Sequence, residues 1–578
     1  MTSGSRMALI LLFAIFRLAK ATEHDANLPR TILELQQFRQ TSSIHIESKA
    51  GRRGIATLVN LNPAINAWYL LRVAWNDGGA QAAFHIENPE PQKQRLLLDE
   101  TYPEGIVVAE ARNRYYCALF EGNGLDEANT SQRIYAPLCD GRVYLRNAAI
   151  GHRTNLEATT EFLREHVWGA EKIIGLGHIL LGDMQRETGT METESTKGAP
   201  KAGGSSEFPL PARVDSKYSD REITSGNLGI DLEVQEKKGM TPGAWYAASE
   251  NPGVYVSILQ PNLIDPTILQ SYKTRVNNLD NTEASALCYL VAFDLDRFEL
   301  GYALGTEHPK VGWSDHMLGQ MRDPQSPGPD GIASIAPLVS TGLVAPMDAA
   351  KTIATFTGGF KREHGAFKYG DLAFRNHGSH YGFIENGIVF SKLQPGLATI
   401  LVLDDGSVEM KTWEEADNRL LARIRHARQN GVPVIEFDRA SQSPAPGVLV
   451  NRWGPGNWSG SEELKLRTMR SGVAIQMNRG KRFLIYAVFS DATPSAMARI
   501  FQAYRCDYAM LLDMNALEHT YLALYRRSGS QMLVDHLLKG MSELDKSTGG
   551  DVVPRFLGYP DNRDFFYVMR RNMQGAKP

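Results

Sequence analysis

In the stretch YAMLLDMNALEHT, residues 508–520, an apolar run is followed by four side chains that can move protons or bind a ligand. These are Asp513, Asn515, Glu518 and His519. Carboxyl and imidazole groups act as general acids and bases when they stand at the edge of a pocket. We therefore predict a functional site here. The competing interpretation is that Asp513 caps the next turn and that Glu518 and His519 are ordinary surface residues.

A second group of polar residues surrounds the double glycine in TFTGGFKREHGAFKYG, residues 355–370. Gly358 and Gly359 permit a sharp turn and a close approach of backbone N–H groups to an anion. Side chains nearby that supply charge or protons are Lys361, Arg362, His364, His377 and His380. The plainer interpretation is a glycine-rich hairpin with solvated basic residues.

The elements around Asp513 predict which residues share an edge. Gly480 in the turn NRGK favours a β-hairpin, and outward pairing from that turn sets Arg470 opposite Phe489 and Ser490. Thr493 can cap a following helix that has Pro494 at its first position. Strand, helix and strand predict a parallel pairing through a right-handed crossover. Asp491, Asp513 and Arg470 are then expected on one side of the molecule.

The rest of the sequence predicts two domains, which follow an N-terminal leader peptide of about 21 residues. Residues 22–183 alternate short apolar runs with turns, which favours a smaller β-rich N-terminal domain with a closing helix. Residues 184–222 are rich in Thr, Ser, Gly and Pro and predict a flexible linker. Residues 223–578 alternate strand-like runs with helical patterns such as ADNRLLARIRHARQNG, residues 416–431. We expect a mixed α/β (α+β) C-terminal domain with a mixed sheet.

Composition narrows the class of partner. Lys and Arg number 62 against 65 Asp and Glu, so nothing indicates nucleic acid as a partner. The first 21 residues combine Arg6, an apolar stretch and a small-residue ending, which predicts a signal peptide and export to the periplasm or the medium. The alternative for this segment is an amphipathic N-terminal helix. No later segment has the length of an integral membrane span.

Four cysteines leave one pairing question open. Cys117 and Cys139 lie near each other in sequence and are expected either as a local disulfide or as two buried thiols. No Cys/His ligand spacing appears, so we expect no structural metal and no cofactor.

Four short segments of the C-terminal half resemble the phosphodiester glycosidase family, to which the glycan-uncovering enzyme belongs. The family has an Asn-Gly-Gly-Phe turn, an Arg-Thr/Ser strand start, an Asp-Gly-Arg segment and a late Leu-Asp-Gly-Gly-Gly-Ser-Ser loop. The similar places here are Thr357-Gly358-Gly359-Phe360, Arg470-Ser471-Gly472, Ser490-Asp491-Ala492 and Leu512-Asp513-Met514-Asn515. The resemblance covers about residues 250–530. Three features depart from its pattern: Thr357 in place of the asparagine, the missing arginine after Asp491, and the loop MNALEHT.

The resemblance implies a hydrolase that cleaves sugar-1-phosphodiesters or related glycoconjugates on the glycosyl side. Arg470 and Lys361 would neutralise the phosphate, with Asp513 as nucleophile or electrostatic stabiliser. Glu518 or His364 would transfer the proton. The full set of candidates is, for catalysis, Asp513, Glu518, His364 and Asp491, and for substrate binding, Thr357, Gly358, Gly359, Lys361, Arg470, Asn515, His519 and His380.

Two other functions remain open from the sequence. A non-catalytic glycan- or envelope-binding protein would use exposed aromatic residues, for which Trp453 and Trp458 in WGPGNWSGS are candidates. A metal-assisted hydrolase would draw on several of the histidines together with Asp513, although their spacing specifies no metal geometry.

Overall fold

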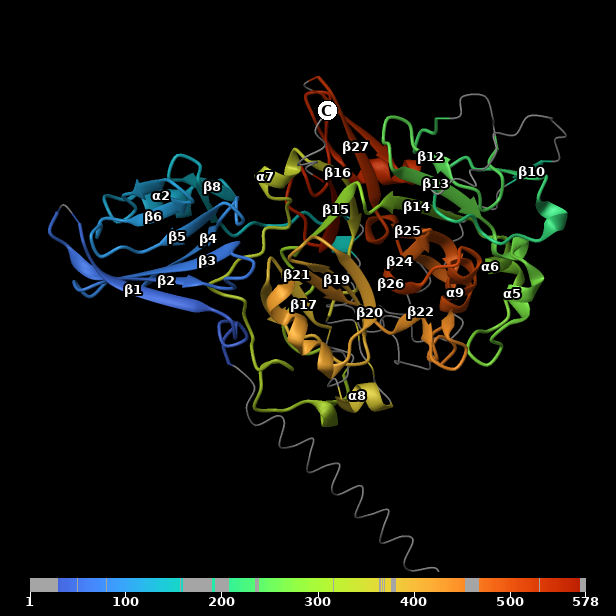
Figure 1. Cartoon of the computed structure of the whole chain (residues 1–578), viewed down its shortest axis with the longest axis horizontal. Helices are drawn as coiled ribbons and strands as arrows, with labels where there is room; N and C mark the ends of the chain where they lie inside the picture. The colour runs from blue at the N-terminus through green and yellow to red at the C-terminus, as the bar shows by residue number, and fades with distance from the viewer. Residues whose placement is uncertain are drawn as a thin grey trace, which may run out of the picture.

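The computed structural model describes residues 30–48, 50–79, 81–155, 157–159, 190–192, 207–233, 239–314, 317–362, 365, 367, 370–375, 381–452, 467–529 and 531–571. The predicted signal peptide lies outside them. The described chain is mostly β-strand, and neighbouring strands within its sheets pair antiparallel (Figure 1). The predicted mixed α/β class with a mixed sheet is therefore wrong.

The N-terminal β unit consists of two antiparallel sheets that enclose a separate hydrophobic core (Figure 1, blue). The larger sheet has the order β1 (Gln40–Glu47), β2 (Arg53–Asn60), β3 (Trp68–Trp75), β4 (Ala82–Glu87), β9 (Val143–Arg146) and β8 (Tyr135–Leu138). The smaller sheet has β5 (Gln94–Leu97), β6 (Ile106–Glu110) and β7 (Arg114–Cys117), and α2 (Gly124–Thr130) follows it. Cys117 and Cys139 form the local disulfide.

Loss of this disulfide is expected to destabilise the protein by about 2–4 kcal/mol, because it closes a loop of 22 residues in the unfolded chain. The Cys117→Ser/Cys139→Ser variant should unfold at a lower denaturant concentration than the wild type. A reducing agent should shift the wild type in the same direction and leave the variant unchanged. An identical midpoint for variant and wild type would contradict the prediction.

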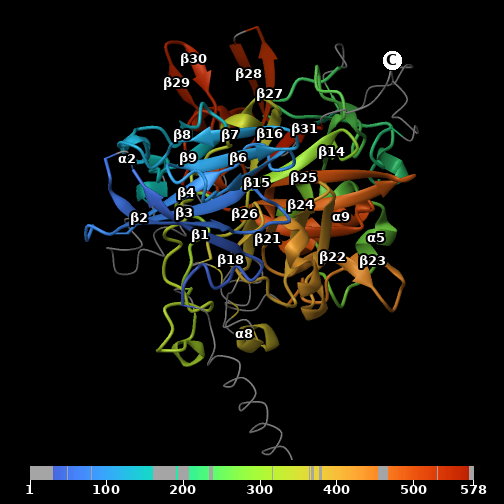
Figure 2. The same cartoon turned by 60° about the vertical axis from the view of Figure 1, so that its left-hand side comes forward.

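The largest sheet is formed by strands between residues 246 and 514 and has eight strands (Figures 1 and 2). Its order is β12 (Tyr246–Ala247), β13 (Val254–Leu259), β14 (Cys288–Asp294), β25 (Lys481–Ala492), β24 (Thr468–Asn478), β26 (Tyr508–Met514), β22 (Pro433–Asp438) and β23 (Ser443–Pro446). Residues of its central strands are almost all buried, so this sheet forms much of the main hydrophobic core.

Two five-stranded sheets complete the C-terminal half. One has the order β15 (Phe298–Ala303), β31 (Phe565–Arg570), β16 (Thr352–Thr357), β27 (Leu522–Ser528) and β28 (Gln531–His536). The other has β18 (Ile388–Ser391), β17 (Phe383–Glu385), β21 (Ile424–Gln429), β19 (Ala398–Leu403) and β20 (Val408–Thr412). Two-stranded pairs are β10 (Thr190–Glu192) with β11 (Glu222–Thr224) and β29 (Lys546–Thr548) with β30 (Asp551–Val553).

The described helices are short. Besides α2, they include α5 (Pro266–Gln270), α6 (Asn281–Ser285), α7 (Pro346–Ala349), α8 (Asp371–Arg375) and α9 (Pro494–Ala503), with 3₁₀ turns η1 (Ser216–Tyr218), η2 (Pro261–Leu263), η3 (Gly319–Met321), η4 (Glu415–Arg423), η5 (Leu517–His519) and η6 (Lys539–Leu544). Among the described residues, none of the helices has the length and apolarity to cross a membrane. The domain limits at 183 and 222 stay predictions.

The segment 416–431, predicted as one helix, is instead the 3₁₀ turn η4 followed by strand β21. β21 lies between β17 and β19 and pairs with both. Its side chains from His426 to Gln429 are buried. Hydrogen bonds to two neighbouring strands outweigh a local helical preference that is worth only tenths of a kcal/mol per residue.

The region around Asp513 has the expected strand directions but a different neighbour order. The hairpin of β24 and β25 turns at Gly480, where φ is 87°, and Arg470 pairs with Phe489 as predicted. Thr493 caps α9 by accepting from the Ala496 N–H, also as predicted. However, α9 carries the chain to the far side of β24, so β26 pairs with β24 and not with β25. β25 and β26 therefore run in the same direction without being paired.

Candidate active site

The site forms where the end of β16, the end of β26 and the start of β31 meet. The Asp513 N–H donates to the Gly358 carbonyl at 3.2 Å, and the Gly358 N–H donates to the Asp564 carbonyl at 2.8 Å. A Cβ atom on Gly358 would lie 2.4 Å from Asp564 Oδ2, so only glycine allows this contact. The double-glycine turn and Asp513, over 150 residues apart in sequence, are thus in direct contact.

Two buried carboxylates share one guanidinium at the centre of this cluster. Arg563 Nη1 donates to Asp513 Oδ2 at 2.6 Å, and Arg563 Nη2 donates to Glu157 Oε1 at 2.8 Å. Arg563 Nη2 also lies 2.7 Å from His519 Nε2. Because Arg has no acceptor atoms, His519 Nε2 is the acceptor and its proton is on Nδ1, which donates to the Met514 carbonyl at 2.5 Å.

The surroundings move the pKa values of the two carboxyls in opposite directions. Burial raises the pKa of Asp513 to about 7, and the nearby Arg563 offsets only part of that effect. Burial also acts to raise the pKa of Glu157, but the charge of Arg563, the hydrogen bond from Asn562 and the charge of Lys361 together hold it well below the usual range. Near neutral pH, Glu157 is therefore ionised, whereas Asp513 is partly protonated.

A histidine–aspartate pair lies beside Asp513. His308 Nδ1 is 2.5 Å from Asp564 Oδ1, and His308 Nε2 is 4.0 Å from Asp513 Oδ2. Asp564 Oδ2 also accepts from the Tyr302 hydroxyl at 2.9 Å and from Arg428 Nε at 2.8 Å. Burial opposes ionisation of Asp564, but Arg428 and His308 lower its pKa to about 2, and burial lowers the pKa of His308 to about 3.

The structure brings several of the residues predicted from the sequence to this cluster. Lys361 Nζ is 3.9 Å from Glu157 Oε1, and Thr357 Oγ1 donates to the His519 carbonyl at 2.7 Å. Glu518 is buried, its backbone carbonyl accepts from Arg555 Nη1, and Thr154 Oγ1 lies 3.4 Å from its Oε1.

The remaining predicted residues hold the strand ends or lie elsewhere. Arg470 is fully buried and donates from Nε to the Ala492 carbonyl and from Nη1 to Met514 Sδ. Asp491 is partly buried near the end of β25, and Asn515 Oδ1 accepts from Thr468 Oγ1. A Cβ on Gly359 would lie 2.7 Å from Asn430 Oδ1, so glycine is needed there too. Outside the described residues lie His364, His377, His380, Trp453 and Trp458.

Four residues of the cluster were not found from the sequence: Glu157, His308, Arg563 and Asp564. A signal existed for two of them, because Arg563 and Asp564 belong to the polar run DNRD directly before the apolar run FFYVM, residues 565–569. This mirrors the polar residues that follow the apolar run before Asp513. Glu157 carried no signal, since a glutamate in a helical pattern normally faces solvent.

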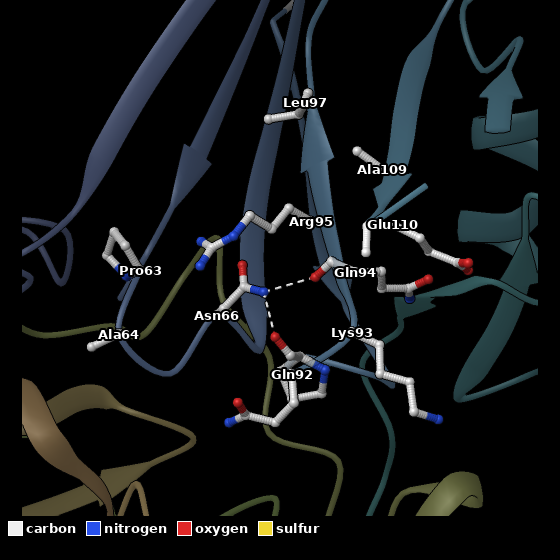
Figure 3. A pocket seen from close by; sticks show the side chains of 12 residues that line it. Pro63, Ala64, Asn66, Gln92, Lys93, Gln94, Arg95, Leu97, Ala109 and Glu110 are labelled. Carbon is white, nitrogen blue, oxygen red and sulfur yellow. Dashed lines mark hydrogen bonds between the residues drawn. The ribbon is translucent and has the colours of Figure 1, made fainter. Parts of the chain in front are cut away.

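A cavity of about 350 Å³ lies in the N-terminal β unit, apart from this cluster (Figure 3). Its wall is held by Asn66, whose Nδ2 donates to the carbonyls of Pro91 and Gln94. None of its lining residues belongs to the Asp513 cluster. Within the described part of the chain, no three His, Cys, Asp or Glu side chains are grouped as a metal site requires.

Comparison with known proteins gives little similarity. The sequence matches no protein-family profile and no curated protein. A weak structural similarity exists to the catalytic domain of zebrafish N-acetylglucosamine-1-phosphodiester alpha-N-acetylglucosaminidase, auto-inhibited by its pro-peptide. The identity is 10%, the TM-score is 0.28, and the match covers 63% of this chain and 96% of that chain. Likeness at this level supports no conclusion about function.

Proposed function

We propose that this protein is a hydrolase that cleaves sugar-1-phosphodiesters on the glycosyl side, at the cluster around Asp513. The observation that carries the proposal is that two buried carboxyls, Asp513 and Glu157, share Arg563 while their pKa values are moved in opposite directions. Two carboxyls with different protonation states are the arrangement that glycosidic cleavage uses.

The positive groups of the cluster suit a phosphate leaving group. Arg563 Nη2 lies 2.8 Å and Lys361 Nζ 3.9 Å from Glu157 Oε1, so two positive charges enter one buried site. In such a site, hydrogen bonds from charged donors are stronger than in water and stabilise charge that develops in the transition state. We assign phosphate neutralisation to these two residues. Arg470 supports the strand end through its contacts with Ala492 and Met514.

In the proposed reaction, Asp513 is the proton-transfer group and Glu157 the stabilising carboxylate. The bond between the anomeric carbon and the phosphate oxygen breaks, its electron pair stays on that oxygen, and protonated Asp513 donates the proton. Ionised Glu157 stabilises the positive charge on the sugar. Water then adds its oxygen to the anomeric carbon and returns a proton to Asp513. This role replaces that of nucleophile or electrostatic stabiliser, which the resemblance implies for Asp513, because burial favours the protonated form of Asp513.

The ligand in this proposal is a carbohydrate phosphodiester of the periplasm or the extracellular space, where the predicted signal peptide would direct the chain. The proposal needs no cofactor, no resident metal and no nucleic acid. The family resemblance places Gly358 and Asp513 in two separate motifs. The hydrogen bond between these two residues supports the proposal that both motifs belong to one site.

The test is hydrolysis of a panel of sugar-1-(methyl phosphates) by the purified full-length protein in ¹⁸O-labelled water. Cleavage on the glycosyl side places the label in the released sugar, whereas attack at phosphorus places it in the phosphate. Nitrophenyl glycosides without phosphate serve as the control for ordinary glycosidase activity. Label in the phosphate, or cleavage of the glycosides alone, would reject the proposal. Binding of a sugar without turnover would favour a glycan-binding protein.

The rate of this hydrolysis is expected to fall as the pH rises through about 7. Asp513 has a raised pKa, so its proton is present below that pH and lost above it. The negative charge of Glu157 contributes to the raised pKa of Asp513. In Glu157→Gln the descending limb of the pH–rate profile should therefore move to lower pH, together with a lower maximal rate. A limb that stays at the same pH in this variant would contradict the assignment.

A further inference from the structure

The ring of His308, which follows β15, is fixed by a single carboxylate. Its Nδ1 is 2.5 Å from Asp564 Oδ1, and Asp564 also accepts hydrogen bonds from Tyr302 and Arg428. A carboxylate held by a guanidinium and a hydroxyl is ionised and can only accept. The proton of the neutral ring is therefore on Nδ1, and Nε2 carries a lone pair that can only accept.

This lone pair is buried without a hydrogen-bond partner. The side chain of His308 is 1% exposed, and its Nε2 is 4.0 Å from Asp513 Oδ2, which is too far for a hydrogen bond. Among the residues that the structure describes, Nε2 has no donor. An unsatisfied buried polar atom destabilises the protein, so a ligand group that supplies a donor here is bound more tightly.

Three other buried polar atoms near His308 also have no hydrogen-bond partner among the described residues. Glu157 Oε2 and Asn562 Oδ1 are buried acceptors without a partner in the described chain, and Arg563 Nε is a buried donor without one. All belong to one connected network, because Asn562 Nδ2 and Arg563 Nη2 both donate to Glu157 Oε1. Three acceptors and one donor complement a ligand that offers several hydroxyl protons and one oxygen acceptor. A sugar has this pattern.

We propose that His308 Nε2 accepts a hydrogen bond from a hydroxyl of the sugar, and that Asp564 makes the site select sugars in which this hydroxyl is free. The inference rests on the proposed function, since it takes the sugar-1-phosphodiester as substrate. His308 is then a specificity-determining residue. Asp564 acts through His308 as a positioning residue.

The experiment compares kcat/KM for the hexose-1-(methyl phosphate) cleaved fastest in the panel with kcat/KM for each of its monodeoxy analogues. The wild type should reject one analogue by about 100-fold or more, because that analogue leaves the His308 lone pair unpaired. His308→Leu should lower the rate on the parent sugar and reduce this discrimination to less than about 3-fold. Discrimination that persists in His308→Leu would overturn the inference.

Two further variants, Asp564→Asn and Tyr302→Phe, test whether the discrimination depends on the tautomer of His308 or only on the packing around its ring. An asparagine side chain can donate to Nδ1 and move the ring proton to Nε2, so Asp564→Asn should lose the discrimination as well. Tyr302→Phe removes another hydrogen bond to the same carboxylate and leaves the His308 contact, so it should keep the discrimination. The ¹⁵N shifts of the His308 ring should report a proton on Nδ1 in the wild type and on Nε2 in Asp564→Asn.

The outcomes distinguish this inference from the proposed function. If the wild type cleaves the parent sugar and all analogues equally well, the inference is wrong and the hydrolase proposal stands. If no phosphodiester is cleaved, the hydrolase proposal fails. Calorimetric binding of the free hexose and its deoxy analogues to wild type and His308→Leu then decides whether the hydroxyl is read. Equal binding to both proteins, or no binding, would overturn the inference.

Discussion

Asp513→Asn is expected to lower kcat/KM for a sugar-1-phosphodiester by a factor of about 10²–10⁴, the usual contribution of a positioned proton-transfer group. An amide cannot donate the proton that the leaving phosphate oxygen needs. Its single oxygen can keep the hydrogen bond from Arg563, whereas the Met514 N–H, which bonds to the other oxygen of Asp513, loses its acceptor. The thermal midpoint should therefore fall only by the loss of one buried hydrogen bond, about 1–3 kcal/mol, while the rate of sugar release falls by the factor given above.

Asp507→Asn is the matched control for this variant. Asp507 precedes the same strand, β26, at its opposite end, and burial raises the pKa of its carboxyl too. It accepts from the Met477 N–H and makes no contact with Arg563. The control should keep its rate within about twofold of the wild type. Full activity in Asp513→Asn would remove Asp513 from the mechanism.

Arg563→Ala is expected to destabilise the protein by about 3–5 kcal/mol, because it leaves two buried carboxyls without their shared cation. Both side chains of the Arg563–Asp513 pair are less than 10% exposed, so water cannot replace the lost charge. Urea unfolding should show a lower midpoint with an unchanged slope. At neutral pH part of the cost will be relieved by protonation of Asp513, so the loss should be larger at pH 8 than at pH 6.

The control is Arg423→Ala, which removes a guanidinium that pairs with Asp404 and Asp405 at the surface. Exposed pairs of this kind contribute about 0.2–1 kcal/mol, so this variant should unfold close to the wild-type midpoint. The double variant Arg563→Met/Glu157→Gln should recover part of the stability lost in Arg563→Ala, because one uncompensated charge is removed with the cation. Equal losses for Arg563→Ala and Arg423→Ala would mean that the Arg563 cluster is open to solvent.

Local residue chemistry was sufficient to predict several elements near the site. The turn at Gly480, the cap at Thr493 and the pairing of Arg470 with Phe489 depend on neighbouring residues and were confirmed. The local disulfide of Cys117 was one of two expected states. That Asp513 lies beside the double-glycine turn agrees with the expectation that both belong to one site, whose function stays a proposal.

Strand neighbours could not be predicted in the same way. β26 was expected beside β25, but it pairs with β24, and the helix expected at 416–431 contains strand β21. Both differences arise from hydrogen bonds between segments distant in sequence, which no local pattern encodes. Because of these pairings the fold is mostly antiparallel β, and not the mixed α/β class predicted from the sequence.

The sequence alone determined that Asp513 stands near the end of a buried strand and is followed by polar residues, because an apolar run and the turn that ends it are specified by residues close together in the chain. Only the tertiary structure decided which groups surround it. Glu157 and Arg563 are 406 positions apart, and their contact exists because the segment after the N-terminal β unit reaches the start of β31. The protonation of Asp513 follows from that packing, since a pKa depends on the water removed and the charges gathered by the whole fold.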